Sequence, residues 1–285
     1  MKGRTVLVTG ANSGMGKATV ASLADMGAKV IMLCRSETRG KQALDEVMQE
    51  SGRDVSLMLC DLGSMDSIRD FVVRFRLEYD RLDVLINNAG VITPDRRETK
   101  DGLELQFGVN HIGHFMLTLL LLSLLKKSDD GRIVVVGSGA HKAGRIHFDD
   151  LNLKRYNVVR SYGQSKLANL LFTRELDRRL KARGIPITVN CVHPGAVATQ
   201  MGVDRNTGFG KTMVGILKPF FLTPEVGAKT AVFLASKDTD GVSGQYFYKC
   251  AVAKSSKRSL DMEAAKKLFD MSEEICGVYF EQTVH

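Results

Sequence analysis

Short apolar runs alternate with longer helical patterns along the 285 residues of this chain. Several runs are apolar at nearly every position and rich in β-branched residues, which is typical of strands covered on both faces. Seven segments have this character: 5–10, 28–34, 54–60, 82–88, 131–138, 187–193 and 244–249. Helical patterns lie between them, over 15–26, 38–50, 64–79 and 164–183 among others. The alternation predicts an α/β protein with a parallel sheet and helices on both faces.

Charge and composition narrow the classes of partner. The formal net charge is +8, with 25% charged and 44% hydrophobic residues, as in an ordinary globular protein. Lys and Arg are scattered, and no basic tract interleaved with aromatic residues indicates nucleic-acid binding. A solvated surface accounts for most of these charges, and a basic face for an anionic ligand is the alternative.

Cysteine spacing and the apolar stretches predict a cytoplasmic protein. Five cysteines lie far apart, without a C-x-x-C pair: Cys34, Cys60, Cys191, Cys250 and Cys276. Such an odd, dispersed set is typical of reduced, mostly buried thiols. The first residues lead into the first predicted strand without a signal-peptide pattern. The most apolar stretch, 115–125, is shorter than a bilayer span, so we expect a buried helix and no integral membrane segment.

A glycine-rich turn follows the first predicted strand and opens a helix, in the stretch VTGANSGMGKA. Small residues there let the backbone approach a pyrophosphate, while the helix N-terminus supplies N–H groups and a positive dipole end. The glycines are spaced G-x-x-x-G-x-G, and a plain tight turn is the alternative interpretation. The candidate cofactor-binding residues of this turn are Gly10, Asn12, Ser13, Gly14, Met15 and Gly16.

The end of the second predicted strand favours NADP(H) over NAD(H). A site for NAD is expected to have an acidic side chain here, about 20 residues past the glycines. This chain has Cys34 followed by Arg35. A guanidinium suits a 2′-phosphate because it forms charge-assisted, bidentate bonds, and a surface arginine is the alternative. Asp61, at the end of the third strand, is either an acceptor for the adenine amino group or a residue near a helix N-cap.

Residues 199–224 lack a clear period and are rich in glycine and apolar side chains. Such irregular segments are often lids or binding loops, and a plain connection with a short helix is the alternative. Their large apolar side chains would line an apolar pocket, or pack against the body or another subunit: Met201, Phe209, Met213, Ile216, Leu217, Phe220 and Phe221.

Together these motifs resemble those of the short-chain dehydrogenase/reductase superfamily. The ordered set is TGANSGMG (9–16), DL (61–62), NNAG (87–90), VN (109–110), GS (137–138), YGQSK (162–166) and HPG (193–195). Further stretches, such as VNHIGHF, SKLANLLFTREL and TPEVGAKTAVFLA, are similar to the retinol dehydrogenase branch. The resemblance covers almost the whole chain. It implies one Rossmann-like domain over residues 1–285, with a doubly wound, seven-stranded parallel sheet.

Two departures from that branch bear on the expectations. Relatives often have two serines where this chain has Gly137 and Ser138, but Ser138 keeps the second place, the functional one in the family. Many members of the branch carry an N-terminal membrane-anchoring segment, which we do not expect here.

Tyr162 and Lys166 lie four residues apart and share one face of a predicted helix. A phenol with a pKa of about 10 needs a drop of about three units, roughly 4 kcal/mol, to act as a base near pH 7. A lysine cation about 5 Å away, at an effective dielectric near 20, supplies roughly 3 kcal/mol. We therefore predict that Lys166 lowers the pKa of Tyr162. An ordinary exposed Tyr–Lys pair is the alternative.

The resemblance assigns roles to four residues. It implies that Tyr162 is the general acid in carbonyl reduction and the base in alcohol oxidation, and that Lys166 also holds the nicotinamide ribose. It implies that Ser138 orients the substrate carbonyl and that Asn110 supports a water relaying protons through Lys166. By the same resemblance the cofactor also contacts Asp61, Leu62, Asn88, Ala89, Gly90, Pro194, Gly195, Val197 and Thr199.

Histidines accompany several of these motifs. His111, His114 and His193 have no carboxylate or cysteine at ligand spacing, so we predict packed, hydrogen-bonded rings and no metal. His141 lies three residues past Ser138, near the expected substrate mouth, and contact with substrate is one of two open interpretations.

These expectations combine into an NADP(H)-dependent oxidoreductase that interconverts a lipophilic alcohol and its aldehyde or ketone, retinoid-like by resemblance. A hydroxysteroid or xenobiotic carbonyl reductase is the alternative substrate class. A non-catalytic NADP-binding sensor or scaffold is the alternative of another class. The resemblance also implies a homodimer or homotetramer formed across the helices that contain 115–125 and 164–183. The apolar segment 199–224 leaves peripheral membrane association open.

Overall fold

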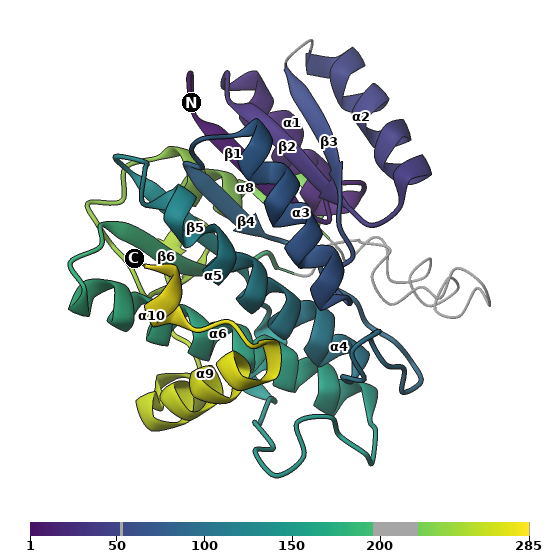
Figure 1. The fold of residues 1–285 in the computed structure, drawn as a ribbon, viewed down its shortest axis with the longest axis vertical. Coiled ribbons are helices and arrows are strands. Elements are labelled where there is room, and N and C mark those ends of the chain that lie inside the picture. The colour runs from purple at the N-terminus through teal and green to yellow at the C-terminus, as the bar shows by residue number, and fades with distance from the viewer. Residues whose placement is uncertain (52–53, 196–221, 285) are drawn as a thin grey trace.

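The predicted parallel sheet is confirmed. A computed structural model describes residues 1–51, 54–195 and 222–284 (Figure 1). Seven strands are parallel, in the order β3-β2-β1-β4-β5-β6-β7. Their bounds are β1 Thr5–Thr9, β2 Lys29–Cys34, β3 Val55–Leu59, β4 Val84–Asn87, β5 Gly131–Val136, β6 Ile187–His193 and β7 Tyr246–Tyr248. The order moves outward from β1 on one side and β4 on the other, which is the doubly wound arrangement.

An eighth strand extends this sheet at one edge. β8 (Ala251–Val252) pairs antiparallel with β7. The turn between them is formed by Lys249 and Cys250, whose φ angles are 52° and 61°. A two-residue hairpin of this kind requires positive φ at both turn residues. A strand of two residues shows no period in the sequence, so its existence was not predicted.

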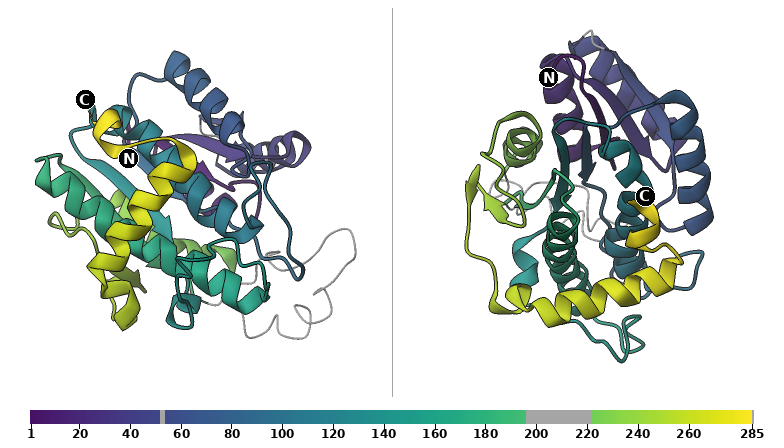
Figure 2. Two further views of the ribbon diagram at one scale, coloured as in Figure 1. Left: turned by 60° about the horizontal axis from the view of Figure 1, so that its bottom comes forward. Right: turned by 60° about the vertical axis from the view of Figure 1, so that its left-hand side comes forward.

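Helices cover both faces of the sheet, as predicted (Figure 2). Their bounds are α1 Gly14–Asp25, α2 Glu37–Ser51, α3 Met65–Glu78, α4 Leu105–Phe107, α5 Gly113–Leu125, α6 Val158–Ala182, α8 Pro224–Ser236, α9 Met262–Cys276 and α10 Phe280–Thr283. One core cluster joins the sheet to α1, α2 and α8, and the other joins its opposite face to α3, α5, α6 and α9. Successive residues of β1 show the division, since Val6 and Val8 belong to the first cluster and Leu7 to the second.

The most apolar segment is a buried core helix. α4, a π-helical turn (Gly108–Ile112) and α5 run continuously over Leu105–Leu125. Among the described residues this is the one helix with the length and apolarity of a membrane span, and its apolar window is 89% buried inside the molecule. The predicted buried helix is therefore confirmed, although it is longer than the stretch 115–125.

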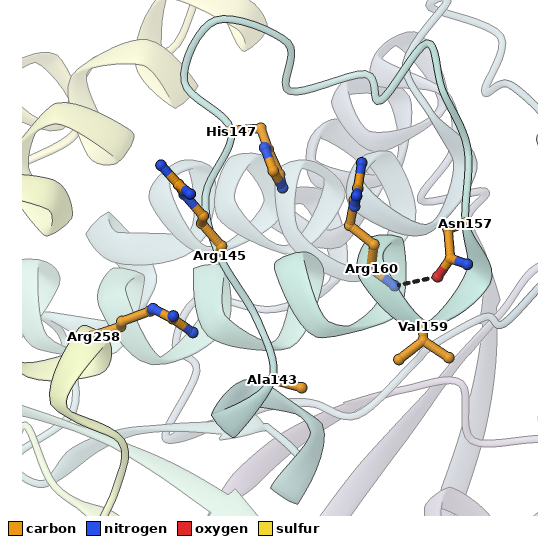
Figure 3. Close-up of a pocket in the computed structure, with 7 residues that line it drawn as sticks. All are labelled: Ala143, Arg145, His147, Asn157, Val159, Arg160 and Arg258. Carbon is orange, nitrogen blue, oxygen red and sulfur yellow. Dashed lines mark hydrogen bonds between the residues drawn. The ribbon is translucent and has the colours of Figure 1, made fainter.

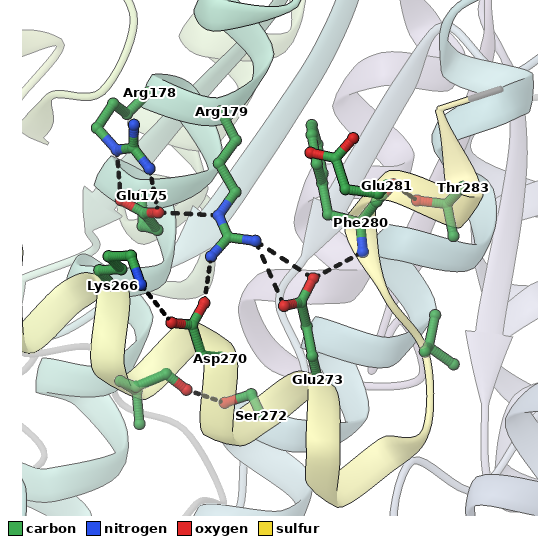
Figure 4. A network of polar contacts seen from close by, with 12 residues as sticks. Glu175, Arg178, Arg179, Lys266, Asp270, Ser272, Glu273, Phe280, Glu281 and Thr283 are labelled. Atoms are coloured by element: carbon green, nitrogen blue, oxygen red, sulfur yellow. Dashed lines mark hydrogen bonds and ion pairs between the residues drawn. The ribbon is translucent and has the colours of Figure 1, made fainter.

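The C-terminal helices lie across α5 and α6 (Figure 2). A network of ion pairs around Arg179 of α6 holds α9 against α6 (Figure 4). Its guanidinium donates to Glu175 at 2.8 Å, to Glu273 at 3.3 Å and to Asp270, and it stacks 3.9 Å from the ring centroid of Phe269. Because Asp270, Glu273 and Phe269 all belong to α9, one side chain ties the end of the chain to α6.

Candidate active site

The glycine-rich turn lies where the strand order diverges, between the carboxyl ends of β1 and β4, which is where ligands bind in doubly wound sheets. Gly10 and Gly14 have φ of 64° and 53°, which favour glycine. A Cβ on Gly16 would lie 2.4 Å from the carbonyl oxygen of Gly10, and one on Gly10 would lie 2.8 Å from Cα of Ala89. The turn is therefore a tight backbone cradle at the start of α1, with the form that a pyrophosphate requires.

Asn88 holds this turn in place. Its Nδ2 donates to the carbonyl oxygen of Thr9 at 2.7 Å and to that of Gly10 at 3.3 Å. The Asn88 side chain is buried, while Ala89 and Gly90 are half-buried beside it. Asn88 therefore fixes the shape of the turn, and the two residues after it line the same edge of the sheet.

A neutral histidine links the glycine-rich turn to the π-helical turn that contains Asn110. Oγ1 of Thr9 accepts from the backbone N–H groups of Asn88 (2.9 Å) and Ala89 (2.8 Å), so it donates to Nε2 of His114 at 2.8 Å. The proton on the ring therefore sits on Nδ1, which donates to the carbonyl oxygen of Asn110 at 3.1 Å. Burial lowers the pKa of His114 to about 4. The prediction of a packed, hydrogen-bonded ring is borne out, but its linking role was not foreseen.

Basic side chains flank the end of β2. Arg35 follows the buried Cys34 and is exposed, and burial raises the pKa of the Cys34 thiol to about 11. Arg39, four residues further on in α2, lies close enough to lower that pKa in part. Arg39 is not among the residues predicted from the sequence. Its signal is a basic side chain in the first turn of the helix that follows Arg35.

Asp61 lies in the turn before α3. Its Oδ1 accepts from N–H of Gly63 at 3.0 Å, while the N-cap of α3 is Ser64. Among the described residues, Oδ2 of Asp61 has no hydrogen-bond partner. Leu62 is buried, and a Cβ on Gly113 would lie 2.3 Å from its carbonyl oxygen. Asp61 therefore has one oxygen engaged in the helix start and one that faces no partner in this part of the chain.

Ser138, Tyr162 and Lys166 meet at the carboxyl end of β5. α6 begins at Val158, earlier than predicted, because Oδ1 of Asn157 caps it by accepting from N–H of Arg160 at 3.0 Å. Nζ of Lys166 donates to the carbonyl oxygen of Val136 at 2.9 Å and lies 5.7 Å from the ring centroid of Tyr162. The side chains of Ser138 and Tyr162 are hydrogen-bonded to each other.

Asn110 lies next to this group, in the π-helical turn. Its Nδ2 donates to Oγ of Ser165 at 3.1 Å, one residue before Lys166. Its Oδ1 accepts from N–H of Val91 at 2.8 Å, and its Nδ2 also donates to the carbonyl oxygen of Val91 at 3.0 Å. The structure thus brings all four predicted catalytic residues together, and π-helical turns of this kind occur often at functional sites.

The pKa of Tyr162 differs from the prediction. Burial raises it, and among the causes that lie in the described residues the hydrogen bond with Ser138 acts in the opposite direction. Burial also lowers the pKa of Lys166 to about 8. In the protein without cofactor the net pKa of Tyr162 therefore lies above its ordinary value, because burial removes its hydration. The contribution of Lys166 to that pKa stays a prediction.

His141 is a support for Ser138 and is fully buried. Its Nε2 accepts from N–H of Ser256 at 3.1 Å, so its Nδ1 carries the proton and donates to the carbonyl oxygen of Ser138 at 2.6 Å. Contact between His141 and substrate, one of the two interpretations of the sequence, is therefore wrong. The described residues contain no cluster of His, Cys, Asp or Glu that could hold a metal ion.

The remaining predicted cofactor contacts follow β6. Gly195 has φ of 84°, and a Cβ there would lie 2.5 Å from the side chain of Leu222. Pro194 and Gly195 are half-buried. Val197, Thr199 and all of the predicted lid except 222–224 lie outside the described residues, and residues 223–224 begin α8.

A nucleotide cradle at the switch point of a doubly wound sheet, beside a Ser–Tyr–Lys group, defines a dinucleotide-dependent dehydrogenase. Residues 4–208 match the family model described as short chain dehydrogenase. The chain belongs to this family, and it is an oxidoreductase that acts on CH–OH donors.

Relatives and solved structures agree with this assignment. The chain is 46% identical to mouse retinol dehydrogenase 14, covering 98% of this chain and 87% of that protein. It is 42% identical to human retinol dehydrogenase 13, covering 97% and 85%. An uncharacterized protein from Mycobacterium paratuberculosis has a TM-score of 0.80 at 35% identity, covering 98% and 95%. A protein of Escherichia coli CFT073, described as a short chain dehydrogenase complexed with NADPH, has a TM-score of 0.68 at 26% identity, covering 87% and 96%.

Proposed function

We propose that this protein is an NADP(H)-dependent oxidoreductase that interconverts a lipophilic alcohol and its aldehyde or ketone, with retinoids as the first substrate class to test. The observation that carries the proposal is the meeting of Ser138, Tyr162 and Lys166 at the end of β5, next to the nucleotide cradle. The names of the retinol dehydrogenase relatives support the substrate class.

The cofactor preference rests on charge at the end of β2. Arg35 and Arg39 offer two guanidiniums at this corner, and a buried thiol stands where an acidic side chain would favour NAD. The NADPH complex of the Escherichia coli structure is consistent with this preference. The dinucleotide would lie along the residues predicted from the sequence, with its pyrophosphate on the turn from Gly10 to Gly16.

Bound dinucleotide supplies the hydride for reduction or accepts it in oxidation. The chain's own residues handle the proton. Tyr162 donates it from its hydroxyl to the carbonyl oxygen in reduction and takes it back in oxidation. Ser138, held by its hydrogen bond to Tyr162 and by the buried His141 behind its carbonyl group, orients the substrate oxygen. The raised pKa of Tyr162 keeps the phenol protonated at neutral pH, which suits the general acid of the reductive direction.

Lys166 and Asn110 act behind Tyr162. The ammonium of Lys166 makes one hydrogen bond among the described residues, to Val136, and so keeps donors for the nicotinamide ribose. Asn110 is fixed at both ends of its side-chain amide by Val91 and Ser165. We assign to it the support of a water that returns protons through Lys166 to Tyr162.

The test is loss of nicotinamide absorbance with NADPH and NADH in parallel. The panel is retinal, a medium-chain aldehyde, a steroid ketone and an aromatic diketone, so that the best substrate separates the retinoid, steroid and xenobiotic classes. Tyr162→Phe should abolish turnover while NADPH binding, measured by fluorescence, survives. The matched control is Tyr79→Phe, which removes a hydroxyl bonded to Ser56 of β3, at the edge of the sheet away from β5. Equal turnover in Tyr162→Phe and the parent would refute the proposal. Cofactor binding without turnover of any substrate by the parent would favour the sensor.

Localisation in the cytoplasm is part of the same proposal. All five cysteines are free, and four of them are buried, which suits a reducing compartment. Cell fractionation combined with flotation on liposomes distinguishes a freely diffusing enzyme from one that works at a membrane surface.

A further inference from the structure

A basic hollow of about 400 Å³ lies beside the N-terminus of α6 (Figure 3). Its walls come from the segment that follows Ser138, from the first turn of α6 and from a 3₁₀ turn near the C-terminus (Lys257–Leu260). The lining residues are Ala143, Arg145, His147, Asn157, Val159, Arg160 and Arg258. A volume of this size admits a small ligand or the polar part of a larger one.

The three arginines of this hollow form no ion pair with any carboxylate in the described parts of the chain. Arg258 donates from Nη1 to the carbonyl oxygen of Gly144 at 3.1 Å, while the guanidiniums of Arg145 and Arg160 have no hydrogen-bond partner there. Like charges gathered around one hollow repel each other, so an anion between them is stabilising.

Other charges near the hollow do not neutralise it. Burial lowers the pKa of His147, and Arg160 and Arg145 lie close enough to lower it further. Among the described residues the one carboxylate that acts against them is Asp150. Oδ2 of Asp150 is engaged with the backbone N–H of Lys154 at 2.8 Å. Residues 142–160 and 254–258 together hold eight Lys or Arg against two Asp, so this region accounts for much of the net charge of +8.

The start of α6 also has backbone N–H groups without partners among the described residues. Of the first amides of α6, N–H of Arg160 is bound by Asn157 Oδ1 and N–H of Ser161 by the Asn157 carbonyl oxygen. Those of Val158 and Val159 have no partner in the described part of the chain. They are the unsatisfied donors of a helix start, and Val159 lines the hollow.

We propose that this hollow binds the phosphoryl group of a ligand other than the dinucleotide. Guanidiniums arriving from three elements suit a tetrahedral group that accepts from several directions. The site is distinct from the end of β2, where Arg35 lies, because β1 and β4 separate β2 from β5. Two sources share this chemistry: a soluble phosphate ester and the head group of an anionic phospholipid. Val159 lines the hollow and is 65% exposed, and Leu260, in the same 3₁₀ turn as Arg258, is 53% exposed. Exposed apolar side chains near basic ones suit a lipid surface.

The experiment compares the full chain with Arg145→Ala/Arg160→Ala. The matched control is Lys127→Ala/Lys229→Ala, which removes two exposed charges after α5 and on α8. All binding is measured with saturating NADPH, so that the phosphate sites of the cofactor are filled, and NADPH affinity is recorded for each variant. Calorimetry with inorganic phosphate and with glycerol 3-phosphate forms one arm. Co-sedimentation with phosphatidylcholine vesicles, with and without phosphatidic acid, forms the other.

We expect phosphate binding that weakens about tenfold for each guanidinium removed and is unchanged in the control. If the protein binds phosphatidic acid vesicles more tightly than it binds glycerol 3-phosphate, the source is the lipid head group. If it does not, the source is the soluble phosphate ester. Equal binding by the two double variants, or no binding by the parent at millimolar phosphate, would overturn the site. Because the proposal does not depend on turnover, its failure with intact NADPH binding leaves the proposed function standing. If the parent does not bind NADPH at all, that result counts against the proposed NADP(H)-dependent function and not against the phosphoryl site.

Discussion

Replacing Arg179 tests whether charge fastens the C-terminal helices to α6. In Arg179→Met the apolar stem over Phe269 is kept and the guanidinium is lost. The side chain of Glu175 is fully buried and that of Glu273 is 10% exposed, and breaking such a pair costs about 3–5 kcal/mol. The low end applies, because Glu175 keeps Arg178 and Glu273 keeps N–H of Phe280 at 2.7 Å. Asp270, 40% exposed, adds under about 1 kcal/mol.

The assay is urea unfolding together with a thermal scan. A loss of about 3 kcal/mol corresponds to a fall in Tm of roughly 6–12 °C for a domain of this size. The matched control is Arg178→Met, which touches the same Glu175 from a side chain that is 52% exposed, and it should cost under about 1 kcal/mol. If the two variants lose the same stability, burial of the network contributes nothing and the reasoning is refuted.

The pH dependence gives a second check on this network. The pKa values of Glu175 and Asp270 are both lowered by their basic partners, against burial that raises them. Carboxyls with lowered pKa values stabilise the fold above their unfolded values of about 4 and lose this as pH falls through the folded values. The difference in free energy of unfolding between the parent and Arg179→Met should therefore be largest at neutral pH and should shrink below about pH 4.

Three further predictions concern the cofactor, the proton and assembly. Arg35→Ala should weaken the binding of NADPH much more than the binding of NADH, and an equal loss of affinity for both would exclude a contact with the 2′-phosphate. Arg39→Ala tests the second guanidinium in the same titration. Lys166→Ala should move the acidic limb of the oxidative rate profile upward by about one to two pH units, the effect of a cation 5.7 Å from the phenol ring; an unmoved limb would show that Lys166 does not act on Tyr162. Because α9 and α10 cover α5 and α6, light scattering should give a single-chain mass, and a dimer would show that pairing uses another face or displaces these helices.

The sheet was predictable because its central strands β1, β2, β4 and β5 are buried on both faces and so appear in the sequence as apolar runs. The four catalytic candidates were predictable from ordered motifs, and the tertiary structure brings them together. What could not be foreseen depends on distant contacts. The burial that raises the pKa of Tyr162, the ring of His141 behind Ser138 and the docking of α9 on α6 have no local signal. The start of α6 does have a local signal, because Asn157 is a recognisable N-cap residue. The helical period of the apolar residues did not extend to it.

The tautomer of His114 couples the nucleotide cradle to acidity. Oγ1 of Thr9 already accepts two backbone N–H groups, so a doubly protonated ring would turn a second donor toward an oxygen with no lone pair to offer. The unfolded chain takes up this proton near pH 6.5 and the folded one only near pH 4. As the pH falls over that interval, the free energy of unfolding decreases by about 1.4 kcal/mol for each pH unit. Acid would therefore weaken the nucleotide cradle and the π-helical turn around Asn110 together, because His114 is bonded to both.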